Sequence, residues 1–336
     1  MAEKHKRKSS TTKTENRVAE ITERLEQGIQ ELFESDRYKA YLKTMAKFYD
    51  YSVNNTILIA MQNPAATMVA GYQAWQNKFG RHVKAGEKGI RILAPMPYKV
   101  KIEKEQADPQ TGQTIKNEDG EPVTEMAEGK RLYGFRVVTV FDISQTAGEE
   151  LPSLGVQELS GNVERYDEFL AAIRTISPVP MECEELPGSA KGYYSRPEQR
   201  IVIRKGMSQI QTIKTAIHEM AHAKLHGSVP EENGQESSEV LEKTRETKEV
   251  EAESVAYTIC QRYGIETSDY SFGYIAGWSS GKEMKELKSS LETIRRTSAE
   301  LIQSLDLQLQ MLAEAQTAEV MERGEVPSAT FTLSMS

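Results

Sequence analysis

The run His218-Glu219-Met220-Ala221-His222 is the feature of this sequence with the clearest chemical meaning. On a helix, residues four positions apart lie above one another on one face, so His218 and His222 can reach a single metal ion. Zinc binds imidazole nitrogens at about 2.0–2.1 Å. Glu219 borders the same face, where it can act as general base on a zinc-bound water. This combination is the minimum needed to hydrolyse an amide bond.

A catalytic zinc site needs a third protein ligand and one open position, and three nearby glutamates are candidates. Glu249 and Glu253 are four residues apart and share a helical face with Ala252 and Ala256, whose small side chains allow a second helix to approach closely. Glu251 points roughly 180° away from that pair. We therefore expect Glu249 to be the ligand and Glu253 to orient a ligating histidine, with Glu251 as the alternative ligand. The alternative without a metal is that all three glutamates belong to a solvated acidic face of the helix.

Three other side chains near this motif have simpler explanations. His226 would lie about 12 Å along the helix axis from His218, too far for the same ion, so we expect a structural histidine. Tyr274 and Trp278 are four residues apart and fit core packing, although a tyrosine hydroxyl can also stabilise an oxyanion. Zn²⁺ is the metal that the ligand types favour, and Mn²⁺ or Co²⁺ can occupy the same site.

The composition limits the class of protein. A chain of 336 residues is long enough for about two domains, and its two cysteines argue against a disulfide framework and for a reducing compartment. No apolar run approaches 18 residues, so we expect no membrane span, and the polar N-terminus does not read as a secretory signal. We therefore expect a cytoplasmic protein. The net charge of −8 conceals an excess of positive charge in the first hundred residues, with 17 Lys+Arg against 10 Asp+Glu.

Periodicity and turn signals predict an α+β fold with two domains. Helical spacing covers about 16–34, 37–48 and 54–62, while 135–144 is a β-branched strand. Farther along, a small sheet is expected within 190–204, before the helix that carries His218 and His222. The expected organisation is a disordered basic arm (1–15), a first domain (16–146) with a hairpin or flap at 98–133, a linker (147–160), a mainly helical second domain with a small sheet (161–281), a C-terminal helix (282–314) and a disordered tail (315–336).

Basic and aromatic residues alternate in the first domain. Residues 41–100 contain 8 Lys+Arg and 2 Asp+Glu. Positive charge follows a phosphate backbone, and exposed aromatic rings stack on unpaired bases. For Trp75, the alternative to a DNA contact is that its ring packs in the hydrophobic core. We expect single-stranded DNA to be a partner, and the candidate contact residues are Tyr51, Asn54, Asn55, Trp75, Arg81, Lys84, Lys88 and Arg91.

Longer motifs resemble a known family. YSVNNTILIAMQNP, VAGYQAWQNKFGRHVKAGEKGIRILAP and FRVVTVFDISQT look like the N-terminal single-stranded-DNA-binding domain of ArdC-type antirestriction proteins. HEMAH and KEVEAESVAY look like the zincin-like metallopeptidase domain that follows it, and are similar to ImmA/IrrE-type peptidases. In those peptidases a Glu-x-x-Ala-(Asp/Asn/Glu) segment supplies the third ligand, and this pattern falls on Glu249 to Glu253.

The resemblance implies a protein of a bacterial mobile element that is associated with single-stranded DNA during conjugation and with protection of incoming DNA from restriction. Its peptidase domain would act on an unknown protein substrate, with no membrane partner. Two alternatives stay open. One is a DNA-binding antirestriction module whose metal site is structural or inactive, and the other is a peptidase that cleaves a repressor and has no affinity for DNA. The intact Glu219 favours an enzyme, because a structural zinc site needs no base.

Overall fold

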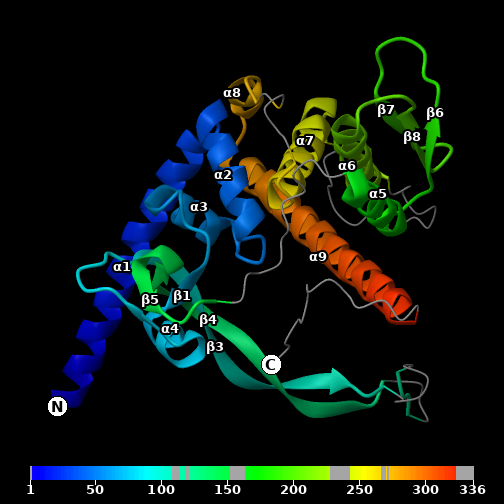
Figure 1. Ribbon diagram of the computed structural model, residues 1–336. Helices are drawn as coiled ribbons and strands as arrows, with labels where there is room; N and C mark the ends of the chain where they lie inside the picture. The colour runs from blue at the N-terminus through cyan, green and yellow to red at the C-terminus, as the bar shows by residue number, and fades with distance from the viewer. Residues whose placement is uncertain are drawn as a thin grey trace.

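The structure is a computed structural model that describes residues 2–107, 114–117, 122–151, 163–227, 243–265, 270 and 272–322. Its architecture is α+β, as predicted: an N-terminal region that combines helices with a sheet precedes a mainly helical C-terminal region with a smaller sheet (Figure 1).

Four helices form the N-terminal helical layer: α1 (Ala2–Leu32), α2 (Ser35–Lys47), α3 (Val53–Gln62) and α4 (Tyr72–Phe79). The helix expected over about 16–34 lies within α1, where Ile21, Leu25 and Ile29 are at most 4% exposed. Helix α1 begins at Ala2, so the expectation of a disordered arm at 1–15 is not met for residues 2–15. This difference arises because the run up to Glu15 contains no Gly or Pro that would end a helix.

An antiparallel sheet lies against these helices with the strand order β1-β4-β3. Its strands are β1 (Val69–Gly71), β3 (Ile90–Glu105) and β4 (Thr124–Asp142), and a separate pair joins β2 (Arg81–Val83) to β5 (Thr146–Gly148). Strands β3 and β4 form a long hairpin that projects from the body of the molecule (Figure 1). Residues 98–105 and 124–133 of the segment expected to protrude belong to this hairpin.

Helix α3 covers the outer edge of β3 through two side-chain amides. Asn55 donates to the Leu93 carbonyl and accepts from the Leu93 N–H, both at 2.9 Å. Gln62 makes the same pair of bonds with Arg91, at 2.9 and 3.0 Å. These amides satisfy backbone groups that an edge strand would otherwise expose.

The C-terminal region is built around a second, three-stranded sheet of order β6-β8-β7, in which β6 runs parallel and β7 antiparallel to β8. Its elements are α5 (Val163–Ile176), β6 (Met181–Glu184), β7 (Gly192–Ser195), β8 (Arg200–Arg204), α6 (Gln209–His226), α7 (Arg245–Arg262), α8 (Ile275–Ser279) and α9 (Met284–Glu322). Among the described strands, β7 has a neighbour on one side only, so no described strand pairs with its other edge.

The two regions share one hydrophobic core. Helix α2 packs on α7, and α9 packs on α7, α5 and α3 (Figure 1). At the centre of the first contact, the hydroxyls of Tyr38 and Ser254 lie 2.8 Å apart, and both residues are fully buried. On α9, the side chains of Leu291, Ile294 and Leu305 are buried in this core.

The predicted domain limits, 16–146 and 161–281, stay predictions. The expected linker at 147–160 lies outside the described residues from 152 onward. Helix α9 continues beyond the expected end at 314, through Glu322, and the rest of the expected tail lies outside the described residues.

Candidate functional site

Helix α6 holds its two motif histidines on the face opposite its core contacts. The helix begins after Ser208, whose side chain accepts from the Gln211 N–H at 3.3 Å. Ile217 and Met220 are fully buried and anchor the inner face. His218 and His222 are one turn apart, and both are only half-buried.

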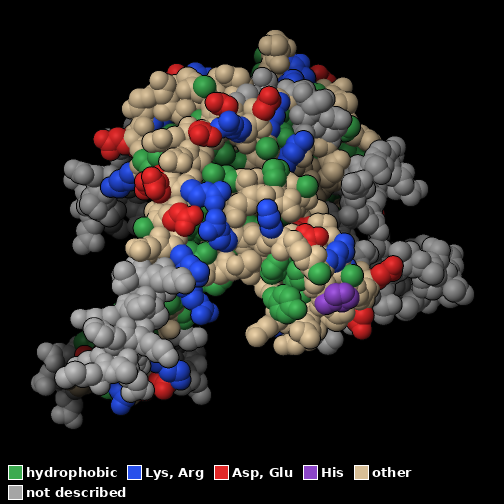
Figure 2. All heavy atoms as spheres, turned by 90° about the vertical axis from the view of Figure 1, so that its left-hand side faces the viewer, with side chains coloured by type: hydrophobic (Ala, Val, Ile, Leu, Met, Phe, Trp, Pro, Cys, Tyr) green, Lys and Arg blue, Asp and Glu red, His purple; other side chains and the backbone are tan. Residues whose placement is uncertain are grey.

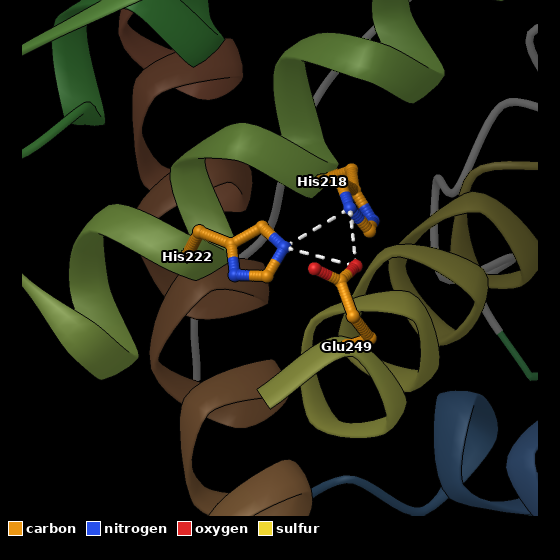
Figure 3. Close-up of side chains that lie close together, drawn as sticks. All are labelled: His218, His222 and Glu249. Carbon is orange, nitrogen blue, oxygen red and sulfur yellow. Dashed lines mark hydrogen bonds and ion pairs between the residues drawn. The ribbon is translucent and has the colours of Figure 1, made fainter. Parts of the chain in front are cut away.

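The three predicted ligands converge on one point (Figure 3). The Nε2 atoms of His218 and His222 lie 3.1 Å apart. Glu249 Oε2 lies 3.6 Å from the first nitrogen and 3.4 Å from the second. Ligand atoms bound at 2.0–2.1 Å around a tetrahedral ion are roughly 3.3 Å apart. The observed triangle therefore fits an ion of the size of Zn²⁺, with one corner of the tetrahedron not filled by these three side chains.

Helix α7 brings Glu249 to the histidines. It begins after Thr244, whose hydroxyl accepts from the Thr247 N–H at 3.2 Å. Ala252 and Ala256 are fully buried at its packing surface, and α7 packs closely on α6. The small alanine side chains permit this approach, which the sequence had indicated.

Glu251 points into the protein, away from the triangle. It is completely buried, and its two carboxylate oxygens accept from Lys243 Nζ at 2.7 and 2.9 Å. The same ammonium group lies 3.5 Å from the Thr293 hydroxyl of α9. Glu251 therefore forms an internal ion pair and is not available as the alternative metal ligand.

Glu253 accepts a hydrogen bond from the Tyr274 hydroxyl. Within the described residues, no hydrogen bond joins it to His218 or His222, so its expected contact with a ligating histidine stays a prediction. Tyr274 is 42% exposed rather than core, because it lies at the start of the short helix α8. Trp278 does pack in the core, and its Nε1 donates to Thr247 at 3.1 Å.

The charges of the triangle favour an anionic carboxylate. Ion pairs with His218 and His222 hold the pKa of Glu249 well below its usual range. Burial would lower the pKa of His218, but its bond to Glu249 and the charges of Glu219 and Glu253 outweigh burial and raise it. Without a cation, Glu249 thus favours protonation of His218, and a metal ion would compete with that proton.

Glu219 lies beside the histidines and is more buried than they are. It is only 9% exposed. Burial raises the pKa of its carboxyl, while the charges of His218 and His222 and a hydrogen bond from the Tyr194 backbone oppose that rise. The Tyr194 bond also joins α6 to strand β7. A carboxylate with a raised pKa is better matched to accepting a proton near neutral pH.

His226 is separate from the triangle. Its ring centroid is 5.7 Å from that of His222, and no Nε2 partner is found among the described residues. Burial and the charge of His222 lower its pKa to about 4, so the ring is neutral at pH 7. It bonds to the Lys248 backbone, consistent with the expected structural role.

Three of the predicted DNA contacts are used inside the fold, and these expectations are corrected. Trp75 is completely buried and its Nε1 donates to the Phe141 carbonyl at 2.8 Å, so its ring cannot stack on a base. The Asn55 amide is bound to the backbone of β3. Arg81 donates from Nε to the Thr146 hydroxyl at 2.8 Å, across the β2–β5 pair.

The other predicted DNA contacts differ in exposure. Tyr51 is half-buried, and its hydroxyl lies 3.4 Å from the Val69 carbonyl. Arg91 pairs with Glu20 of α1 at 3.5 Å. Asn54, Lys84 and Lys88 are exposed, and Lys84 Nζ also donates to the Ser144 carbonyl at 2.9 Å.

Comparison with sequence families matches both halves of the chain. Residues 12–141 match the N-terminal domain of the anti-restriction factor ArdC, and residues 184–265 match the IrrE N-terminal-like domain of the M78 peptidases. The fold and the site thus define a two-domain protein whose second domain has a peptidase-like fold. These two matches are to the pair of domains expected of ArdC-type antirestriction proteins: an ArdC-like N-terminal domain followed by an IrrE N-terminal-like domain.

An uncharacterized protein of Bacillus anthracis, pXO2-81, is 28% identical over 302 aligned residues, which cover 80% of this chain and 47% of the relative. The chain thus spans about half the length of that relative. The metal-free crystal structure of the antirestriction protein ArdC from the R388 plasmid is 22% identical, with a TM-score of 0.42 over 77% of this chain and 84% of that one. The corresponding Mn(II)-bound structure is 20% identical, with a TM-score of 0.41 over 78% and 84%.

No helix among the described residues is both long and apolar enough to cross a bilayer.

Proposed function

We propose that this chain is a metal-dependent peptidase linked to a single-stranded-DNA-binding domain, with an antirestriction role. The observation that carries the proposal is the triangle of His218 Nε2, His222 Nε2 and Glu249 Oε2, with sides of 3.1, 3.6 and 3.4 Å. These three residues would hold the ion, and Zn²⁺, Mn²⁺ and Co²⁺ all accept this donor set. When bound, such an ion acidifies a water molecule and polarises a carbonyl group.

Within this site, Glu219 has the role of proton carrier. Its carboxylate accepts a proton from the attacking water and delivers it to the leaving amine. Its low exposure limits its own contact with bulk water. The raised pKa of the Glu219 carboxyl matches a group that must both take up and release a proton near neutral pH.

The edge of β7 with which no described strand pairs supports a peptide substrate. The Tyr194 backbone reaches Glu219, so a chain laid along β7 would pass close to the general base. Extended peptides bind to free sheet edges through backbone hydrogen bonds, without demanding a particular sequence. The substrate class that fits is therefore an extended, unfolded or loop segment of a protein.

The DNA-binding part rests on the match to the ArdC N-terminal domain and on charge. Residues 41–100 contain 8 Lys+Arg against 2 Asp+Glu. On the side where α1 lies in Figure 1, Figure 2 shows Lys and Arg side chains gathered in a band. Phosphate contacts supply most sequence-independent affinity for nucleic acid.

The test combines metal content with cleavage. The wild-type chain, loaded with Zn²⁺ or Mn²⁺, is incubated with a peptide library, and products are identified by mass spectrometry. Glu219→Gln should keep the metal and lose cleavage. Cleavage by the Glu219→Gln variant at the wild-type rate would contradict the assigned role. Metal binding with no cleavage by either chain would instead favour the second candidate, a DNA-binding module with a structural or inactive metal site.

A further inference from the structure

The β3–β4 hairpin is divided by charge. Its near part, residues 88–100 and 129–141, contains six Lys and Arg residues and no Asp or Glu. The far part, 101–128, contains eight Asp and Glu and three Lys. The two near segments are paired strand to strand, from Ile90 with Val140 to Val100 with Gly129. This near hairpin (residues 88–100 and 129–141) therefore has no carboxylate of its own. Two of its cations pair with carboxylates from outside it, Lys99 with Glu128 at 2.9 Å and Arg91 with Glu20 at 3.5 Å, so the cations that it offers an anionic partner are chiefly its exposed arginines.

The near hairpin also carries exposed aromatic rings. Tyr133 is 78% exposed, Tyr98 45% and Phe135 46%. The rings of Tyr98 and Tyr133 meet edge to face, with centroids 6.4 Å apart. Large exposed rings are costly to leave in water and mark surfaces that meet a partner. Neither tyrosine hydroxyl has a hydrogen bond with another residue in the described part of the chain.

A break in the strand register presents Tyr133 to solvent. Met96 pairs with Gly134 and Pro97 pairs with Leu132, so Tyr133 is an extra residue in β4 that has no partner in β3. Such a bulge redirects a side chain and increases the local twist. The two prolines of β3 that flank this point, Pro95 and Pro97, cannot donate to an added strand. The surface is thus suited to side-chain contacts rather than to sheet extension.

Two arginines lie on the same face as this aromatic pair. Arg131 is directly opposite Tyr98 in the register, and Arg136 is opposite Ala94, four residues before Tyr98. Alternation along a strand puts positions 94, 96 and 98 on one face. Both arginines are exposed. Rings at the centre with guanidinium groups on either side match the chemistry of an unpaired strand, whose bases stack while its phosphates need positive charge.

We infer that Tyr98, Tyr133, Arg131 and Arg136 form the surface on which single-stranded DNA stacks. This inference rests on the DNA-binding part of the proposed function and gives that part a location. A protein partner would be expected to meet acidic as well as basic side chains, and the near hairpin has no acidic ones. The far part of the hairpin is acidic and would repel the strand, which confines the binding site to the near part.

The first experiment measures affinity. Binding of fluorescently labelled dT20 to the full chain is followed by anisotropy over a range of salt concentrations. Tyr133→Ala should weaken binding by roughly 5- to 100-fold, the range that follows loss of a base–aromatic stack, while Tyr133→Phe should retain it. Arg131→Gln and Arg136→Gln should each reduce the slope of log affinity against log salt by about 0.7. Lys104→Gln, an exposed change in the far part, is the matched control and should leave affinity and slope unchanged.

The second experiment reports on stacking itself. The two natural tryptophans, Trp75 and Trp278, are buried. A Tyr133→Trp variant therefore adds an exposed indole whose fluorescence should be quenched when dT20 stacks on it. Quenching that follows the anisotropy curve supports the inference.

Three results would overturn it. If the wild-type chain binds dT20 but the tyrosine and arginine variants bind equally well, the strand lies elsewhere and the proposed function survives. If the wild-type chain does not bind dT20, the DNA-binding part of the proposed function falls as well. If Tyr133→Ala converts a dimer into a monomer in sedimentation without changing dT20 affinity, the surface serves self-association instead.

Discussion

Glu249 and Glu251 lie two residues apart on α7 and have opposite environments. Glu249 is half exposed and faces two imidazoles, whereas Glu251 is fully buried against Lys243. A difference of two residues turns a helical side chain by about 200°, which is why one helix can serve both a metal site and an internal ion pair. Glu249 and Glu251 therefore do not belong to one acidic surface.

Replacing Glu251 should reveal this division. Glu251→Gln leaves Lys243 without its charged partner. Because the Lys243 side chain is 33% exposed, water moderates the effect, and we expect a loss of about 2–3 kcal/mol in the free energy of unfolding. Metal content should stay at the wild-type level. Urea unfolding and elemental analysis measure the two quantities, and loss of metal without loss of stability would contradict the assignment.

The convergence of the three candidate metal ligands could be predicted from the sequence, and the internal bonding of several candidate DNA contacts could not. The spacing of His218 and His222 and the face of Glu249 are set within one or two helices, so local periodicity is enough. The burial of Trp75 depends on a carbonyl at Phe141, 66 residues away, and the use of Asn55 depends on Leu93, 38 residues away. Such contacts follow from the pairing of distant elements, which no local pattern records.

At the scale of elements, Asp142 fixes the end of β4. Its carboxylate accepts from the N–H groups of Thr67, Met68 and Ser144 at 2.8, 3.1 and 3.0 Å, and from the Ser144 hydroxyl at 2.6 Å. Asp142 is only 2% exposed. This carboxylate joins the segment before β1 to the turn η1 (Ile143–Gln145), and so sets the base of the hairpin.

The stability conferred by Asp142 should depend on pH. Burial would raise the pKa of its carboxyl, but these hydrogen bonds outweigh burial and lower it below 3.8. A lowered folded-state pKa means that the unfolded chain binds the proton more tightly. The contribution is therefore complete above about pH 5 and is lost as pH falls through 3.8 toward the folded-state value.

The test is Asp142→Asn, which replaces an acceptor by a donor facing N–H groups. We expect a loss of about 2–4 kcal/mol at pH 7, measured by urea unfolding, and a difference from wild type that shrinks below about pH 4. Asp167→Asn, at an exposed position on α5, is the control and should change little. A constant difference between pH 7 and pH 3 would show that the carboxylate charge is not what stabilises this turn.

For the whole molecule, the important feature is that one core joins the N-terminal and C-terminal regions. Helix α9 has no metal ligand and no predicted DNA contact, yet it packs on α3 as well as on α5 and α7. The Arg295 side chain of α9 reaches the Tyr49 carbonyl at 3.5 Å, and Gln303 donates to Asp50 at 2.9 Å. The C-terminal helix therefore connects the N-terminal region to the region that carries the candidate metal site.

A pair of changes on α9 tests this connection. Leu305 is fully buried and Leu307, two residues on, is 60% exposed. Leu305→Ala should cost about 2–5 kcal/mol, and Leu307→Ala should cost close to nothing. Hydrogen exchange should show the segments around α3 and around α6–α7 losing protection at the same urea concentration. Protection that persists around α3 after α6 and α7 have opened would contradict a shared core.

The decisive measurement is equilibrium dialysis of the metal-stripped chain against Zn²⁺, followed by elemental analysis. The triangle of His218, His222 and Glu249 predicts that the wild-type chain holds a single ion and that His218→Ala, His222→Ala and Glu249→Gln do not. Glu246→Gln, an exposed change three residues earlier on α7, should bind like the wild type. Stoichiometric zinc in the Glu249→Gln variant, or none in the wild type, would contradict the metal centre on which the peptidase proposal depends.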